Sequence, residues 1–485
     1  MAAFVTRLLI NNEAVDASDG ACFERINPAT GDTATIAAAA TLDDVAHVAN
    51  VAAAAFATWS ETGPGDRRAL LNKAADILAG RSEELIGAMM AETGATRLWG
   101  EINCQLAVDI FRDAAAMTTA IGGEVVPTER PGDLAMAIRQ PAGVCLAIAP
   151  WNAPVILGAR AVAMPLACGN SVILKASELC PKTHCLLGEI LQQAGFPAGA
   201  INVITTAPKD TAGLVEALIA HPAIRRVNFT GSTRVGRIIA EMCARHLKRC
   251  LLELGGKAPV IILEDADLDH AVAAVAFGAF MNQGQICMST ERVIVMEAVA
   301  DEFIARFRAK ALTLTAGDPA AGHNPLGNMI SSEAARRVKG LVDDAIGKGA
   351  ALVCGGTVNA AAMNATVIDH VTPAMRLYHE ESFGPVAAII RTDSIDEAVT
   401  IANDNDYGLS SAIFSRDIKA ALGIARRIES GICHINQATV GDEPQMPFGG
   451  VKASGYGRFG GKAAIDEFTE LRWVTFGPGA IEYPI

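Results

Sequence analysis

The stretch AGVCLAIAPWNAPVILGARAVAMPLACGNSVILKASE, residues 142–178, decides the fold class of this chain. It is the most apolar region of the sequence, but three prolines and the polar residues Asn152 and Arg160 interrupt it. A membrane-spanning helix needs about 20 consecutive, mainly apolar residues, so this region is not a membrane span. The runs at 144–149 and 171–175 instead predict two buried strands, with a helix between them.

The same alternation of strand and helix continues along the chain. Strands are predicted at 144–149, 171–175, 201–204, 226–229, 259–263, 292–296, 387–391 and 432–435. Helices are predicted at 43–59, 67–93, 182–194, 211–220, 234–245 and 268–281. This spacing is typical of βαβ units, so we expect an α/β protein with largely parallel sheets. A strand at 472–476 stands outside the pattern and has to pair with something, for which another subunit is one candidate.

Length and composition exclude several classes of protein. A chain of 485 residues is too long for one core and suggests roughly three units. Its 51% hydrophobic and 19% charged residues exclude a disordered chain, and its net charge of −13 argues against a nucleic-acid partner. The N-terminal segment does not resemble an export signal, so we expect a cytoplasmic protein with reduced cysteines. No zinc-type pattern of cysteine and histidine occurs, and we expect no metal.

Three residues have the chemistry of an acyl-transfer site. Cys287 follows a glycine-containing loop and would be a nucleophile as its thiolate, although most cysteines are small buried hydrophobes. Glu253 lies among apolar and glycine neighbours, where burial suits a carboxylate to be a general base; a surface glutamate is the alternative. The amide of Asn152 follows a strand and can donate to an oxyanion, or merely stabilise a turn.

Two segments have the context of a nucleotide site. Gly231 and Ser232 follow a strand and open a helix, where backbone N–H groups bind phosphate; simple capping of the helix is the alternative. Lys175 and Glu178 lie just past a strand, where a carboxylate can accept ribose hydroxyls and repel a 2′-phosphate, unless the two form a solvated loop pair. The GxGxxG pattern at 455–460 follows a loop rather than a strand, which favours a packing or turn role.

Taken together, these segments resemble the aldehyde dehydrogenase superfamily over essentially the whole chain. Eight motifs occur in the family's order: NPATG at 27–31, APWN at 149–152, KASE at 175–178, FTGST at 229–233, LELGGK at 252–257, GQIC at 284–287, EESFGP at 380–385 and PFGGVKASG at 447–455. The resemblance implies two Rossmann-like parallel-sheet lobes and a small β oligomerisation element. The NAD-binding domain would comprise 1–119 and 142–252, the catalytic domain 253–450, and the oligomerisation element 120–141 and 467–485.

The resemblance also assigns roles to single residues. Cys287 matches the family's nucleophile, Glu253 its general base and Asn152 its oxyanion donor. The residues matched to NAD binding are Trp151, Lys175, Glu178, Gly231, Ser232, Gly255, Glu381 and Phe383. Glu178 favours NAD over NADP, whereas Arg234 stands where the family often has an acidic residue.

Three segments, at 151–160, at 164–177 and from 434–436 through 455–461, look most like the branch that oxidises aromatic aldehydes. The residues expected to surround the substrate are Trp99, Leu157, Arg160, Ile286, Met288, Val440 and Phe448, and the small Ala153 leaves room for a ring. The Arg160 guanidinium would bind a phenolic oxygen or stack on the ring; pairing with an acidic residue at the tunnel rim or subunit interface is the alternative.

We therefore expect NAD-dependent oxidation of an aromatic aldehyde, with salicylaldehyde first and vanillin or benzaldehyde next, by a homodimer or homotetramer. Two other classes compete. A cysteine-dependent esterase would leave Ser232, Glu178 and Glu381 unexplained. A non-catalytic relative would have no reason to retain Cys287 with Glu253 and Asn152.

Overall fold

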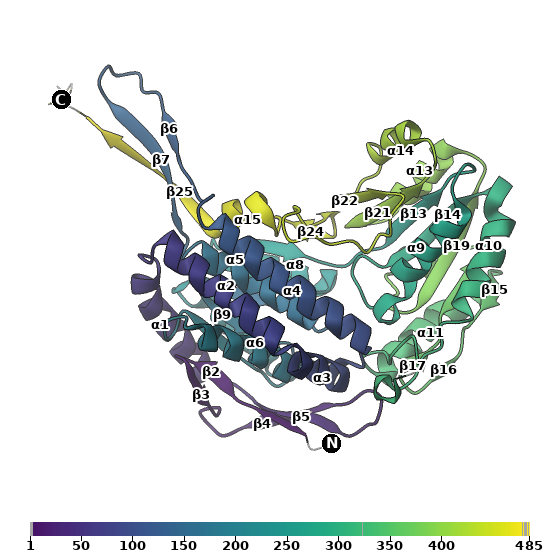
Figure 1. Ribbon diagram of the computed structural model, residues 1–485, viewed down its shortest axis with the longest axis horizontal. Coiled ribbons are helices and arrows are strands. Elements are labelled where there is room, and N and C mark those ends of the chain that lie inside the picture. The colour runs from purple at the N-terminus through teal and green to yellow at the C-terminus, as the bar shows by residue number, and fades with distance from the viewer. Residues whose placement is uncertain (1–2, 323, 478, 480–482, 484) are drawn as a thin grey trace.

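The structure is a computed structural model that describes residues 3–322, 324–477, 479, 483 and 485. Two parallel-centred sheets form two lobes, and a long three-stranded arm projects from the body (Figure 1). The predicted α/β class with two parallel-sheet lobes and a small β element is confirmed. The ends of the predicted domain ranges at 1–2 and at 478, 480–482 and 484 lie outside the described residues.

The first lobe is built on an eight-stranded sheet in the order β24-β12-β11-β8-β9-β10-β2-β3. The strands added by antiparallel pairing are β24 (Gly455–Tyr456), β2 (Leu8–Ile10) and β3 (Glu13–Val15). Its parallel strands are β12 (Arg249–Glu253), β11 (Ile224–Thr230), β8 (Val144–Ile148), β9 (Ser171–Lys175) and β10 (Ile201–Ile204). Its helices include α1 (Leu42–Trp59), α5 (Pro154–Ala167), α6 (Pro181–Ala194), α7 (Thr211–Ala220) and α8 (Thr233–Arg245). The carboxyl ends of the parallel strands share one edge, where ligands bind in open α/β sheets.

The second lobe contains a seven-stranded sheet in the order β15-β18-β19-β14-β13-β21-β22. Its strands are β15 (Ala351–Cys354), β18 (Thr366–Asp369), β19 (Val386–Thr392), β14 (Thr290–Met296), β13 (Ala258–Ile262), β21 (Ser410–Phe414) and β22 (Ile432–Ile435). All neighbours are parallel except β15 and β18. Helix α9 (Leu268–Phe280) connects β13 to the segment that carries Cys287.

The arm consists of β6 (Glu124–Val126), β7 (Leu134–Pro141) and β25 (Thr469–Phe476), all antiparallel (Figure 1). The lone strand expected at 472–476 belongs to β25. Its partner is β7 of the same chain, in a register that runs from Thr469 opposite Pro141 to Phe476 opposite Leu134. The expectation that the strand must pair is met within the chain, and another subunit, which was one candidate, is not its partner in this register.

The single helix expected at 67–93 is also wrong, because the structure has two helices there. Helix α2 (Pro64–Gly80) and helix α3 (Ser82–Thr93) meet at Arg81, which has the non-helical angles φ −107° and ψ 14°. Gly80 is a weak helix former. The Arg81 guanidinium bonds both Glu84 and Glu189, and the latter belongs to α6.

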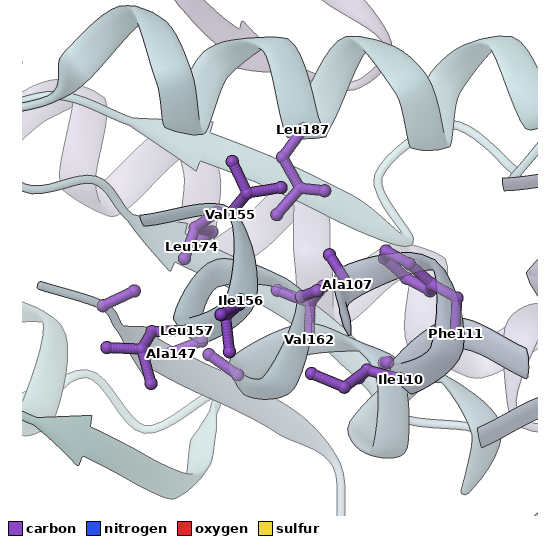
Figure 2. Packing of buried hydrophobic residues seen from close by; sticks show 14 of the residues in the cluster. Ala107, Ile110, Phe111, Ala147, Val155, Ile156, Leu157, Val162, Leu174 and Leu187 are labelled. Carbon is purple, nitrogen blue, oxygen red and sulfur yellow. The ribbon is translucent and has the colours of Figure 1, made fainter. Parts of the chain in front are cut away.

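Helix α5 lies at the centre of the largest core cluster, buried over its whole length. Figure 2 shows its apolar side chains beside those of α4 (Arg97–Met117), the strands β8 and β9, and α6. Trp151 and Asn152 lie just before the N-terminus of α5, so this packing holds the helix that follows them. Rigid packing of this kind suits a site that must hold groups in place.

The described part of the chain has neither a membrane-spanning helix nor a cluster of metal-binding side chains. None of its helices is long and apolar enough to cross a membrane. Its histidine, cysteine and acidic side chains form no group of three or more that could hold a metal ion.

Candidate active site

One cavity of about 340 Å³ opens at the carboxyl edge of the first sheet and faces the second lobe. Nine of the residues singled out from the sequence line it: Trp151, Asn152, Gly231, Ser232, Glu253, Gly255, Cys287, Glu381 and Phe383. These residues follow β8, β11 and β12 in one lobe and belong to loops of the other. Folding therefore brings together residues that lie more than 200 positions apart in the sequence.

Cys287 lies in the loop between α9 and β14, after the short 3-10 helix at Met281–Gly284. Asn282 and Gln283 both have left-handed backbone angles there. Gly256 packs so closely on the Cys287 carbonyl that a side chain at this glycine would collide with it. Burial, together with the nearby Glu253 carboxylate, raises the pKa of the Cys287 thiol well above its usual range. In this arrangement the thiol is protonated and needs a base.

Glu253 ends strand β12 and is only 1% exposed. Among the described residues, neither carboxylate oxygen of Glu253 has a well-aligned hydrogen-bond donor. The Cys287 thiol is the neighbouring group that interacts with this carboxylate. Burial raises the pKa of Glu253 to about 7, while the Arg160 charge works in the opposite direction. A carboxylate with this pKa can both accept and release a proton near neutral pH.

Asn152 lies between β8 and α5 and is 6% exposed. Its side-chain amide lines the cavity and has no hydrogen-bond partner among the residues that the structure describes. Its backbone carbonyl, by contrast, is firmly held by two donors. An amide that is free on a fixed backbone can serve as a donor to an oxygen bound in the cavity.

The residues expected at a cofactor form a compatible cradle. A side chain at Gly255 would come within 2.7 Å of a Glu381 carboxylate oxygen, so this glycine leaves space beside the carboxylate. Glu381 accepts a 2.8 Å bond from the Gly256 N–H, and burial raises its pKa to about 8. The rings of Trp151 and Phe383 meet edge to face at 5.7 Å. Glycines, a carboxylate and ring faces of this kind fit a nucleotide.

Of the residues expected on the adenosine side, Ser232 lines the cavity, whereas Lys175 and Glu178 are not among its lining residues. The Lys175 ammonium lies 2.7 Å from the Glu178 carboxylate, which also accepts a 2.6 Å bond from the Thr211 hydroxyl. Glu178 is thus fixed rather than solvated, and the Lys175 charge lowers its pKa although burial opposes this. Ser232 caps α8 by accepting a bond from the Val235 N–H, so the capping role is present at the site expected for phosphate.

The residues expected around the substrate pack against the nucleophile. Trp99, Leu157, Ile286, Met288 and Phe448 are buried members of the same core cluster, against which Cys287 and Val440 pack.

Arg160 pairs with an acidic residue, which was the alternative to substrate binding considered from the sequence. Its guanidinium forms an ion pair with Asp442 and lies 4.2 Å from the centre of the Phe448 ring. Arg160 and Asp442 are 6% and 11% exposed, so the pair is nearly enclosed.

Sequence reasoning missed three residues of the site. Arg337 lines the cavity and donates to the carbonyls of Glu381 and Ser382. The buried Glu291 accepts bonds from the N–H groups of Ser382 and Phe383 and pairs with the Lys257 ammonium at 2.7 Å. No local pattern marks either residue, because both act on a loop that is distant in the sequence. Asn282 lies just before the GQIC motif and was given no role.

Known proteins match the whole chain. A family model described as "Aldehyde dehydrogenase family" matches residues 15–474. A vanillin dehydrogenase of Pseudomonas fluorescens is 57% identical over 478 residues, which is 99% of each chain. A salicylaldehyde dehydrogenase of Pseudomonas sp. (strain C18) is 50% identical over 99% of each chain. Among solved structures, this chain is similar to a salicylaldehyde dehydrogenase from Pseudomonas putida G7 that was crystallised in complex with salicylaldehyde. The two superpose with a TM-score of 0.98 at 49% sequence identity, over 99% of this chain and 100% of the other.

Proposed function

Because the chain belongs to the aldehyde dehydrogenase family, we propose that it oxidises aromatic aldehydes to carboxylic acids with NAD as the cofactor. The observation that carries this proposal is the convergence of Cys287, Glu253 and Asn152 on one cavity beside a glycine-lined nucleotide cradle. A thiol, a base of pKa about 7 and a free amide donor are the groups that cysteine-based acyl chemistry requires.

The first step forms a bond between the Cys287 sulfur and the aldehyde carbon. Glu253 takes the thiol proton, and the negative charge moves to the former carbonyl oxygen. The Asn152 amide and the Cys287 backbone N–H donate to this oxyanion, and loss of one such donor typically lowers the rate by about 10²–10³. When bound, NAD supplies a positively charged ring that accepts the hydride from the same carbon.

The second step hydrolyses the thioester that remains on Cys287. Glu253 first releases the thiol proton to solvent. It then removes a proton from water, which attacks the acyl carbon and breaks the carbon–sulfur bond. The sulfur leaves as a thiolate and the acid is released. The apolar residues packed around Cys287 exclude bulk water, so that the water used is the one that Glu253 orients.

The substrate class is proposed from relatives and from the apolar environment of Cys287. Relatives named for vanillin and for salicylaldehyde are 57% and 50% identical. The sequence alone ranked salicylaldehyde first, whereas identity favours vanillin, so both are the substrates to compare. The small Ala153 and the aromatic side chains of Trp99 and Phe448, which belong to the core cluster against which Cys287 packs, suit an aromatic ring.

For the cofactor, the family uses NAD or NADP, and we propose NAD for this chain. The fixed Glu178 carboxylate, paired with Lys175 at 2.7 Å, would accept the two ribose hydroxyls of NAD and repel a 2′-phosphate. Trp151, Gly231, Ser232 and Gly255 would hold the rest of the dinucleotide, and Glu381 and Phe383 the nicotinamide end.

We further propose the division into an NAD-binding domain (1–119 and 142–252), a catalytic domain (253–450) and an oligomerisation element (120–141 and 467–485). The arm leaves large apolar side chains exposed, with Trp473 at 80% and Leu471 at 61%. A second copy of the chain would cover them in a homodimer or homotetramer.

A panel of aldehydes tests the proposal. With NAD present, kcat/KM for salicylaldehyde, vanillin and benzaldehyde should exceed that for a short aliphatic aldehyde, and Cys287→Ala should abolish turnover. A preference for the aliphatic aldehyde would overturn the aromatic assignment. An esterase would turn over activated esters but no aldehyde, and a non-catalytic relative would turn over neither.

A further inference from the structure

The backbone carbonyl of Asn152 accepts two hydrogen bonds from segments far away in the sequence. The indole N–H of Trp99 donates at 2.9 Å, and the side-chain amide of Asn282 donates at 2.9 Å as well. Trp99 and Asn282 are each 4% exposed, so neither bond competes with bulk water. A carbonyl with both lone pairs engaged by buried donors is held in both position and direction.

Anchoring this oxygen controls the direction of the Asn152 side chain. The peptide group is planar, so a fixed carbonyl fixes the plane that begins at the Asn152 Cα. Ala153, the N-cap of α5, offers no side-chain cap, and the next carbonyl along the turn, that of Pro154, lies 3.1 Å from a ring nitrogen of the buried His184. The amide itself remains without a protein partner within the described residues and points into the cavity.

Asn282 reaches the nucleophile's loop at the same time. Its side-chain amide also donates a longer bond of 3.4 Å to the Gln285 backbone carbonyl. The backbone carbonyl of Asn282 accepts a 3.0 Å bond from the Gln285 N–H. Gln285 lies two residues before Cys287. One side chain therefore links the segment that carries the oxyanion donor to the loop that carries the sulfur. The backbone of Asn282 is left-handed (φ 49°), and in this conformation its side chain reaches the Asn152 carbonyl.

We propose that Trp99 and Asn282 are positioning residues that hold the Asn152 amide, through its backbone carbonyl, at the oxyanion that forms next to Cys287. This inference rests on the proposed function and gives Trp99 a role besides that of a wall of the substrate site. Trp99→Phe keeps an aromatic ring and removes the donor, and Asn282→Ala removes the second one.

The variants should slow every reaction that passes through an oxyanion. We expect Trp99→Phe and Asn282→Ala each to lower kcat for aldehyde oxidation about tenfold. Hydrolysis of 4-nitrophenyl acetate without nucleotide should fall by a similar factor. Alkylation of Cys287 by iodoacetamide, which displaces iodide and creates no oxyanion, should stay within about twofold of the wild type.

Trp59→Phe is the matched control. Trp59 is 1% exposed and its indole N–H donates to the Asn170 carbonyl at 3.0 Å, away from the cavity. It should lose melting temperature as Trp99→Phe does, but keep kcat. If Trp99→Phe changes only KM, the residue is merely a wall.

A cycle with Asn152→Ala decides the mechanism. Without the amide, adding Trp99→Phe should cost less than about twofold in ester hydrolysis. A full tenfold loss in that background, or an equal loss in iodoacetamide alkylation, overturns the inference. If the wild type oxidises aldehydes and the variants do so equally well, the positioning role fails and the proposed function stands. If the wild type oxidises no aldehyde, the proposed function itself fails.

Discussion

The guanidinium of Arg160, on α5, is paired with the carboxylate of Asp442, which lies 282 residues later in the chain. The pair stands over the Phe448 ring and within electrostatic reach of the base Glu253. The two members act on the pKa of Glu253 in opposite directions: Arg160 lowers it and Asp442 raises it. Burial is the main cause of the raised pKa of Glu253, and this ion pair adjusts it.

Replacing either member should therefore shift the pH dependence of turnover. Glu253 must be ionised to act as a base, so activity rises with pH through its pKa of about 7. Arg160→Met removes a positive charge, raises that pKa and moves the acidic limb of the kcat profile to higher pH. Asp442→Asn should move it to lower pH. Profiles recorded between about pH 5 and pH 9 measure this, and shifts of the same sign would contradict it.

The sequence predicted most of the sheets and the nucleophile's surroundings, because both depend on local patterns. Strands buried on two faces give continuous apolar runs, as at β9 and β14, and their ends locate the site. The strands β12, β18 and β21 were not predicted, since they are short or begin with polar residues.

Contacts between distant residues could not be predicted from local patterns. The bond from Asn282 to Asn152 spans 130 residues, and the bonds from Glu291 to the Ser382 loop span 91. The first pair depends on how the two lobes meet and the second on how the second lobe folds, and no window of sequence contains either. Motif order nevertheless placed Cys287 and Glu253 at the same cavity.

The choice between NAD and NADP depends on one charge. Glu178→Gln keeps the shape of the side chain but removes its repulsion of a 2′-phosphate. We expect the ratio of kcat/KM for NAD to that for NADP to fall by about tenfold, the equivalent of 1.4 kcal/mol. Glu189→Gln is the control, because Glu189 is also paired with a lysine but is not one of the residues matched to cofactor binding. An unchanged ratio for Glu178→Gln would show that another group selects the cofactor.

The apolar arm should determine the assembly state. Trp473→Glu places a charge on a surface that is 80% exposed in one chain, so burial in an oligomer would become costly. We expect a smaller species in light scattering coupled to size exclusion. Leu312→Glu, at a 54% exposed position on another surface, should leave the mass unchanged. A wild-type monomer, or no change in Trp473→Glu, would exclude the arm as the interface.

Glu253 is proposed to act on water after the hydride has left, and this order can be measured. Glu253→Gln can accept a proton neither from the Cys287 thiol nor from water. The thiol proton must then leave to solvent, so acylation should slow, but hydrolysis should slow further and the thioester on Cys287 should accumulate. Rapid mixing of the variant with NAD and aldehyde should give a burst of about one NADH per site, followed by turnover slowed about 10²- to 10⁴-fold. Cys287→Ala should show no burst, since no thioester forms. If Glu253→Gln also lacks the burst while iodoacetamide still alkylates Cys287, the carboxylate is needed for hydride release as well, and its assignment to the hydrolytic step is wrong.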